Sequence, residues 1–174
     1  EGTGNTLRLH PAVTVAGEFA EPVNAWRGIP QTYECTQLLG FGAEAQDRLW
    51  IVPAFAHPMG FATMLPGHGT AHRELMRQYG HVAVLTAMLH DETAGEVEPD
   101  GDLGVAINYW PNRADAAQLM RGMEACGELL FAAGATRVHL PFATPAVYER
   151  PEALAGVRDL ELKRGLCDVT AVHP

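Results

Sequence analysis

The chain has 174 residues, a formal net charge of −9, and 47% hydrophobic and 19% charged residues. This length suits one ordinary domain with its own core. Eleven arginines and a single lysine do not make the basic surface that nucleic acid or anionic lipid would need. No window holds the roughly 18 uninterrupted apolar residues of a membrane span, and the first residues lack the pattern of a signal peptide.

The first third of the chain predicts strands. Residues 13–19 alternate apolar and more polar side chains with a period of two, which is typical of a half-buried strand. Residues 31–39 and 48–56 are two further strand candidates. Pro53, inside the last of these, favours an edge position or a bulge because proline has no N–H for a sheet ladder.

The middle of the chain is less regular. Residues 57–69 read as a loop or a short irregular helix, and a helix is expected from an N-cap at Thr70 to a stop at Gly80. Residues 81–90 form an apolar run that fits either a strand or a buried helix. Residues 95–110 predict a hairpin, since Pro99-Asp100-Gly101 has the composition of a turn between two extended arms.

The clearest helix is expected over residues 113–133, with Asn112 as its N-cap and Gly134 at its end. One face of it is apolar at three-and-four spacing: Ala116, Leu119, Met120, Met123, Cys126 and Leu130. A strand over 137–141, a loop over 142–150, a short helix over 151–156 and a final strand over 169–172 follow. Strands without regular βαβ alternation predict an α+β domain, an antiparallel sheet with helices packed on one face.

The cysteines Cys35, Cys126 and Cys167 are odd in number and include no C-x-x-C pair. This pattern predicts buried free thiols in a reducing compartment, so we expect a cytoplasmic protein. Cys126 lies within the apolar helical pattern, which indicates a small core residue rather than a reactive thiol.

Several motifs are interpreted most simply as structure. "GFGAEA" at residues 40–45 matches the dinucleotide fingerprint in letters, but a strand-like segment follows it instead of a helix, which favours a glycine-rich turn. His68 and His72 have the i, i+4 spacing of a zinc site, yet Gly69 interrupts the turn between them, and no metal site is expected. The acidic run "EVEPDGD" lacks the twelve-residue calcium loop and is typical of a solvated hairpin tip. The chain has no serine, so a serine nucleophile is excluded.

Four other stretches carry a resemblance when they are taken together and in order. The first is "NTLRLHPAVTVAGEFAEPVNAWRGIPQTY", in which a strand carries "LHP" and Glu21, Pro22, Val23, Trp26 and Gly28 form the "EPV-x-x-W-x-G" loop that follows. "FAHPMGFATMLPGHGTAHRELMRQYGHVAVL" comes next, followed by "FAAGATRV" and a terminal "AVHP". In this order they resemble the glucose–methanol–choline (GMC) family of flavin-dependent oxidoreductases, near its long-chain alcohol oxidases and bacterial dehydrogenases, over nearly the whole chain.

The resemblance implies a specific role for His173. "AVHP" is similar to the opening of the family's "HPMGTC" signature, whose histidine stands beside the flavin ring. By this resemblance His173 is the catalytic acid/base that helps to remove the alcohol proton, a role that suits a side chain titrating near neutral pH. A second "HPMG", starting at His57, lies mid-chain and is interpreted as a structural loop.

The resemblance also implies what the chain contains and what it lacks. We expect residues 1–174 to be a substrate-binding domain that lacks the flanking FAD-binding segments, with FAD in the full-length protein and none bound by this chain alone. Its partners would be a small-molecule alcohol and the missing segments of the same protein. Candidates for the alcohol pocket are aromatic residues of the expected strands: Tyr33, Trp50, Phe55, Tyr109 and Trp110.

Two alternatives to the oxidoreductase remain open at this point. The chain could be a stand-alone binding or interaction module without redox activity. A metal-dependent hydrolase built on His68 and His72 is the third possibility, and bound zinc would reveal it.

Overall fold

The structure is a computed structural model that describes residues 4–27, 29, 31–40, 46–55, 57–65, 67–102 and 104–171. Its centre is a six-stranded sheet in which every pairing is antiparallel. The strand order is β2-β3-β1-β6-β7, and β8 pairs with the first residues of β1. The strands are β1 (Pro11–Glu18), β2 (Leu49–Ala54), β3 (Val82–Leu89), β6 (Arg137–Leu140), β7 (Ala146–Tyr148) and β8 (Thr170–Ala171).

The alternation expected in the first strand gives the sheet two different faces. Val13 and Val15 of β1 are fully buried in the main core, whereas Thr14 and Ala16, which alternate with them, point to the opposite face. The apolar run at residues 81–90 is β3, a strand and not a helix, and it pairs with β1 over seven residues. β2 lies at the edge of the sheet, where Pro53 was expected.

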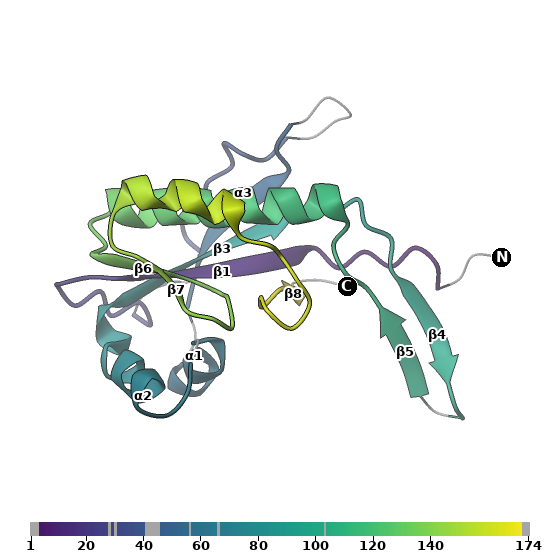
Figure 1. Cartoon of the computed structure of the whole chain (residues 1–174), viewed down its shortest axis with the longest axis horizontal. Coiled ribbons are helices and arrows are strands. Elements are labelled where there is room, and N and C mark those ends of the chain that lie inside the picture. The colour runs from purple at the N-terminus through teal and green to yellow at the C-terminus, as the bar shows by residue number, and fades with distance from the viewer. Residues whose placement is uncertain are drawn as a thin grey trace.

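Helix α3 (Arg113–Ala132) covers one face of the sheet (Figure 1). Its predicted N-cap is confirmed, because the Asn112 side chain accepts a hydrogen bond from the backbone N–H of Asp115. The predicted apolar face is confirmed as well, with Leu119, Met123 and Cys126 completely buried. The 3₁₀ helix η2 (Pro151–Asp159) packs along α3 and closes this core.

The opposite face carries less helix. Helix α1 (Pro58–Met64) contributes Phe61, which packs with Val82 and Val84 at one end of the sheet. Helix α2 (Gly69–Arg77) and the turn η1 (Tyr79–His81) lie beside α1, below the sheet in Figure 1. The α+β class with an antiparallel sheet is therefore confirmed, with the long helix on one face and the short α1 against the end of the other.

The hairpin of β4 (Glu96–Asp100) and β5 (Gly104–Asn108) is a separate two-stranded sheet, as the turn at Pro99-Asp100-Gly101 predicted. It projects away from the six-stranded sheet (Figure 1), and all of β5 is exposed. Its acidic tip is thus solvated, in keeping with the interpretation of "EVEPDGD".

Three local predictions were wrong. Residues 31–39 make only single bridges, Cys35 to Ile51 and Leu39 to Arg48, because a turn closed by the Leu39 N–H and the Thr36 carbonyl lies between them. Helix α2 starts at Gly69, so its N-cap is His68 and not Thr70, and it ends at Arg77 before η1. The loop expected over 142–150 contains β7, whose pairing with β6 is a tertiary contact that no local pattern signals.

Two glycines of α3 should respond differently to alanine. A Cβ on Gly122 would lie 2.8 Å from the Cβ of Ala87, which is held rigidly in β3. A Cβ on Gly127 would meet the end of the Leu154 side chain, 2.8 Å away, which can rotate. Overpacking lowers the free energy of unfolding by about 1–3 kcal/mol. Replacing a helical glycine by alanine raises it by about 1 kcal/mol through helix propensity, so the two effects oppose each other.

We therefore expect Gly122→Ala to lower the free energy of unfolding by about 1–2 kcal/mol, while Gly127→Ala stays near zero. Urea denaturation followed by circular dichroism measures both variants. A larger loss for Gly127→Ala than for Gly122→Ala would contradict the packing of α3 on β3.

Candidate functional site

The face of the sheet that points away from α3 is a candidate substrate surface. Strand register places Trp50, Met88 and Ala12 in one row across β2, β3 and β1, and Val52, Thr86 and Thr14 in the next. Ala12, Val52 and Met88 form a small apolar cluster with Trp50 packed against it. We call these six residues the sheet-face patch.

The polar groups of the sheet-face patch are few. The hydroxyls of Thr14 and Thr86 lie 3.4 Å apart, within hydrogen-bond distance, in the row next to the apolar cluster. At the edge, the indole N–H of Trp50 donates to the Glu34 carboxylate at 2.9 Å. Apolar contacts with a small number of placed polar groups are the usual composition of a small-molecule site. In this structure Ala12, Val52, Met88 and Thr86 are buried, and Trp50 and Thr14 are the partly exposed members of the patch.

The five aromatic candidates do not gather in one pocket. Trp50 belongs to the sheet-face patch. Tyr33, in the segment before β2, is 82% exposed, and Phe55, directly after β2, is 42% exposed. Neither of them is part of the cluster around Trp50.

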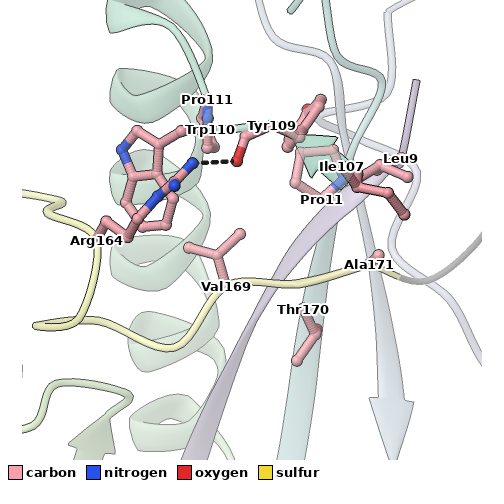
Figure 2. A pocket seen from close by; sticks show the side chains of 10 residues that line it. All are labelled: Leu9, Pro11, Ile107, Tyr109, Trp110, Pro111, Arg164, Val169, Thr170 and Ala171. Carbon is pink, nitrogen blue, oxygen red and sulfur yellow. Dashed lines mark hydrogen bonds between the residues drawn. The ribbon is translucent and has the colours of Figure 1, made fainter. Parts of the chain in front are cut away.

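Tyr109 and Trp110 instead line a cavity of about 300 Å³ between the end of β5, the start of β1 and β8 (Figure 2). Arg164 closes one side: its guanidinium lies 5.6 Å from the centre of the Trp110 ring and donates to the Tyr109 carbonyl at 2.7 Å. The other lining residues are Leu9, Pro11, Ile107, Pro111, Val169, Thr170 and Ala171.

The phenol of Tyr109 is a hydrogen-bond donor here. It donates to Asp91 Oδ2 at 2.6 Å. Burial, with this bond to a carboxylate, raises the pKa of Tyr109 well above its ordinary value. The hydroxyl therefore stays protonated and holds the segment 91–93, rather than accepting a proton from a substrate.

His173 lies outside the described residues. The last described strand, β8, ends at Ala171, which pairs with Pro11 and lines the cavity of Figure 2. Thr170 pairs with Ala12 of the sheet-face patch and Ala171 with Pro11, so β8 runs away from the patch toward the start of β1.

Two of the other histidines singled out in the sequence, His57 and His72, have local structural partners, whereas His68 is the N-cap of α2 without a side-chain capping hydrogen bond. His57, in the internal "HPMG", is the N-cap of α1, and its Nδ1 accepts from the Gly60 N–H at 3.3 Å. His72 Nε2 lies 2.7 Å from the Ala62 carbonyl oxygen, which joins α2 to α1. Within the ranges that the structure covers, no group of three His, Cys, Asp or Glu side chains could hold a metal ion.

Two of the three cysteines, Cys126 and Cys167, are poor nucleophiles. All three are free thiols. Burial raises the pKa of Cys126 strongly, and burial together with the nearby Asp168 raises the pKa of Cys167 to about 12. Since the thiolate is the reactive form, neither thiol is available for covalent catalysis near neutral pH.

The described residues do not fit the phosphates of a dinucleotide. Residues 41–45 of the "GFGAEA" motif lie outside the description, but the chain around them is clear. The Gly40 N–H donates to the Asp47 carbonyl, and the Leu49 N–H donates to the Leu38 carbonyl. The segment before the motif and the segment after it therefore run antiparallel to each other, and the second continues into β2. A dinucleotide fingerprint needs a helix to begin there, with its N-terminus facing the pyrophosphate.

Sequence reasoning missed a cluster of polar side chains on the sheet, near the face that carries the sheet-face patch. Glu18 of β1 contacts both His139 and Arg137 of β6, at 2.6 and 2.7 Å. The signal in the sequence was weak, since a single histidine within "RVHLP" is compatible with an ordinary surface strand. Only the pairing of β1 with β6 brings the two side chains together.

Comparison with known proteins points to one family. No family model matches the chain. A protein of Mycobacterium tuberculosis, from strains CDC 1551 and H37Rv and named an uncharacterized GMC-type oxidoreductase, is 32% identical over 146 residues. These residues are 82% of this chain and 22% of that protein.

A second relative is the long-chain-alcohol oxidase FAO1 of Arabidopsis thaliana, 29% identical over 137 residues, 76% of this chain and 17% of that protein. The chain therefore spans about a fifth of the length of the curated relatives it matches. Among the described residues, no helix is long and apolar enough to cross a membrane.

Proposed function

Because this chain belongs, as a segment, to the GMC family of oxidoreductases, we propose that it is the substrate-binding domain of an FAD-dependent enzyme that oxidises alcohols. The observation that carries the proposal is the two-sided sheet. Helix α3 and η2 fill the core on one face, and the sheet-face patch occupies the other. A rigid sheet is a suitable support for a substrate surface, since loops position side chains less accurately.

In this proposal the sheet-face patch holds the alkyl part of the alcohol. Trp50, which is partly exposed, supplies the accessible apolar contact, with the buried Met88 and Val52 packed against it. Each methylene of the alcohol that it covers gains free energy. The Trp50 indole N–H already donates to Glu34, so the Thr14 and Thr86 hydroxyls are the groups of these two rows that we expect to orient a substrate hydroxyl.

GMC oxidoreductases are generally FAD-dependent, and the flavin supplies hydride acceptance from the alcohol carbon. The described residues of this chain do not fit the FAD phosphates, so we assign FAD binding to other segments of the full-length protein and expect no tight binding by this chain alone. His173, following β8, is the proposed acid/base that takes the alcohol proton.

The proposal is tested on the full-length protein with its flavin. Anaerobic addition of a series of primary alcohols of increasing chain length should bleach the oxidised flavin absorbance. A preparation without flavin, or one whose flavin no alcohol reduces, would favour the stand-alone binding module instead.

Trp50→Leu probes the sheet-face patch directly. Loss of the aromatic contact should raise KM for a long-chain alcohol about tenfold, which corresponds to about 1.4 kcal/mol, with a smaller effect on kcat. Trp26→Leu is the matched control: Trp26 is also partly exposed, but it stacks on Tyr79 beyond the other end of β3. Equal KM values for the wild type and Trp50→Leu would show that Trp50 does not contact the substrate.

A further inference from the structure

His139 has a buried side chain, and one of its two ring nitrogens lacks a hydrogen-bond partner among the described residues. Its side chain is 8% exposed, and that of Glu18 is 7% exposed. His139 Nε2 lies 2.6 Å from Glu18 Oε1, and the second oxygen of Glu18 receives Arg137 at 2.7 Å. His139 Nδ1 is fully buried and finds no hydrogen-bond partner within the part of the chain that the structure describes.

A small cavity adjoins this histidine. It measures about 20 Å³ and is bounded by Thr14 and Ala16 of β1, Val84 of β3, Phe61 of α1 and His139 itself, with Leu65, Leu140 and Pro141 completing it. A cavity needs roughly 10–15 Å³ to hold a water molecule, so this one has room for one and for no organic ligand. His139 and Thr14 are the lining residues with polar side chains, and the other lining residues are apolar.

The chemistry of the ring selects water as the occupant. With Nε2 directed at a carboxylate, Nδ1 is an acceptor if the imidazole is neutral and a donor if it is protonated. Water can donate or accept, so it satisfies Nδ1 in either state. The Thr14 hydroxyl, whose bond to Thr86 at 3.4 Å is long, has the capacity for a second bond to that water.

We propose that the cavity between Thr14 and His139 is a binding site for one ordered water molecule, which bridges the Thr14 hydroxyl and His139 Nδ1. This water connects two groups between which no hydrogen bond or ion pair is found in the described part of the chain. On one side is the Arg137–Glu18–His139 cluster, and on the other is the threonine pair of the sheet-face patch. The inference rests on geometry alone and holds whether or not the chain serves an alcohol oxidoreductase.

The deciding experiment is a crystal structure of the full-length protein at a resolution that shows ordered water. We expect one water with its oxygen within about 3.2 Å of both His139 Nδ1 and Thr14 Oγ1. An empty cavity, or a protein atom hydrogen-bonded to Nδ1, would overturn the proposal.

Two threonine variants provide a matched comparison. Thr14→Val removes the second polar partner of the water and should reduce its occupancy by at least half. Thr86→Val, on the same face but not lining the cavity, should leave the water in place. In protein labelled with ¹⁵N-histidine, the Nδ1 resonance of His139 should shift in Thr14→Val and stay unchanged in Thr86→Val. Equal shifts in both variants would indicate a general disturbance of the sheet and would count against the bridge.

Discussion

Replacing His173 by asparagine in the full-length protein is expected to lower kcat for alcohol oxidation by a factor of about 10²–10⁴. This is the usual contribution of a positioned general acid or base. Asparagine is close in size and polarity but cannot take the alcohol proton, so binding of the alcohol should change little. Steady-state kinetics and the rate of flavin reduction in a stopped-flow instrument measure the effect, and the wild-type dependence of that rate on pH should be lost.

The chain supplies its own control in the second "HPMG". His57 caps α1 through its Nδ1 and has no proposed part in the reaction. Asparagine is also a good N-cap residue, so His57→Asn should fold and keep its activity within a factor of two. A His173→Asn enzyme as active as His57→Asn would rule out the proposed acid/base.

Replacing Asp115 by alanine should produce the largest loss of stability. Asp115 is completely buried in the first turn of α3. Its carboxylate accepts hydrogen bonds from Arg48 at 2.9 Å, from the Thr93 hydroxyl at 2.6 Å, and from the backbone N–H groups of Thr93 and Glu92 at 2.7 and 3.0 Å. These bonds fasten the start of α3 to the entry of β2 and to the segment after β3.

Removing one partner of a buried charge pair costs about 3–5 kcal/mol, because the other charge stays buried without compensation. The pair of Arg48 with Glu92 at 3.2 Å is half in solvent, since the Glu92 side chain is 65% exposed, and it can offset little of this loss. We therefore expect Asp115→Ala to lower the free energy of unfolding by about 3–5 kcal/mol in urea denaturation.

Asp102→Ala is the appropriate comparison, because Asp102 is exposed at the tip of the β4–β5 hairpin. Its effect should stay within about 0.5 kcal/mol. A loss below about 1 kcal/mol for Asp115→Ala would mean that the network around Arg48 contributes little.

Local patterns predicted those parts of the fold that local chemistry controls. The side chain of Asn112 and the three-and-four spacing of apolar residues are sufficient for α3, because capping and amphipathic burial act within a few turns. The turn at Pro99-Asp100-Gly101 and the alternation in β1 were likewise predicted from residues that are close together in the sequence. The strand expected over residues 31–39 was wrong because a turn closed by the Leu39 N–H and the Thr36 carbonyl interrupts the segment, and the segment has no glycine or proline to signal that turn.

The candidate site depended much more on tertiary contacts. Among the aromatic candidates, Trp50 joins Met88 and Ala12 only through the pairing of β2, β3 and β1. Tyr109 and Trp110 lie in another cavity beside β8. Composition and spacing identified suitable residue types but could not tell which of them share a face.

By itself, the sequence determined the family, the α+β class and the ends of α3, since each depends on an ordered set of residues or on contacts a few positions apart. Only the tertiary structure decided the groups at the sheet face. Glu18 and His139 are 121 residues apart, and Thr14 and Thr86 are 72 apart. A strand's period of two puts a side chain on one of two faces, and which partners it meets there depends on the order and register of strands distant in the chain.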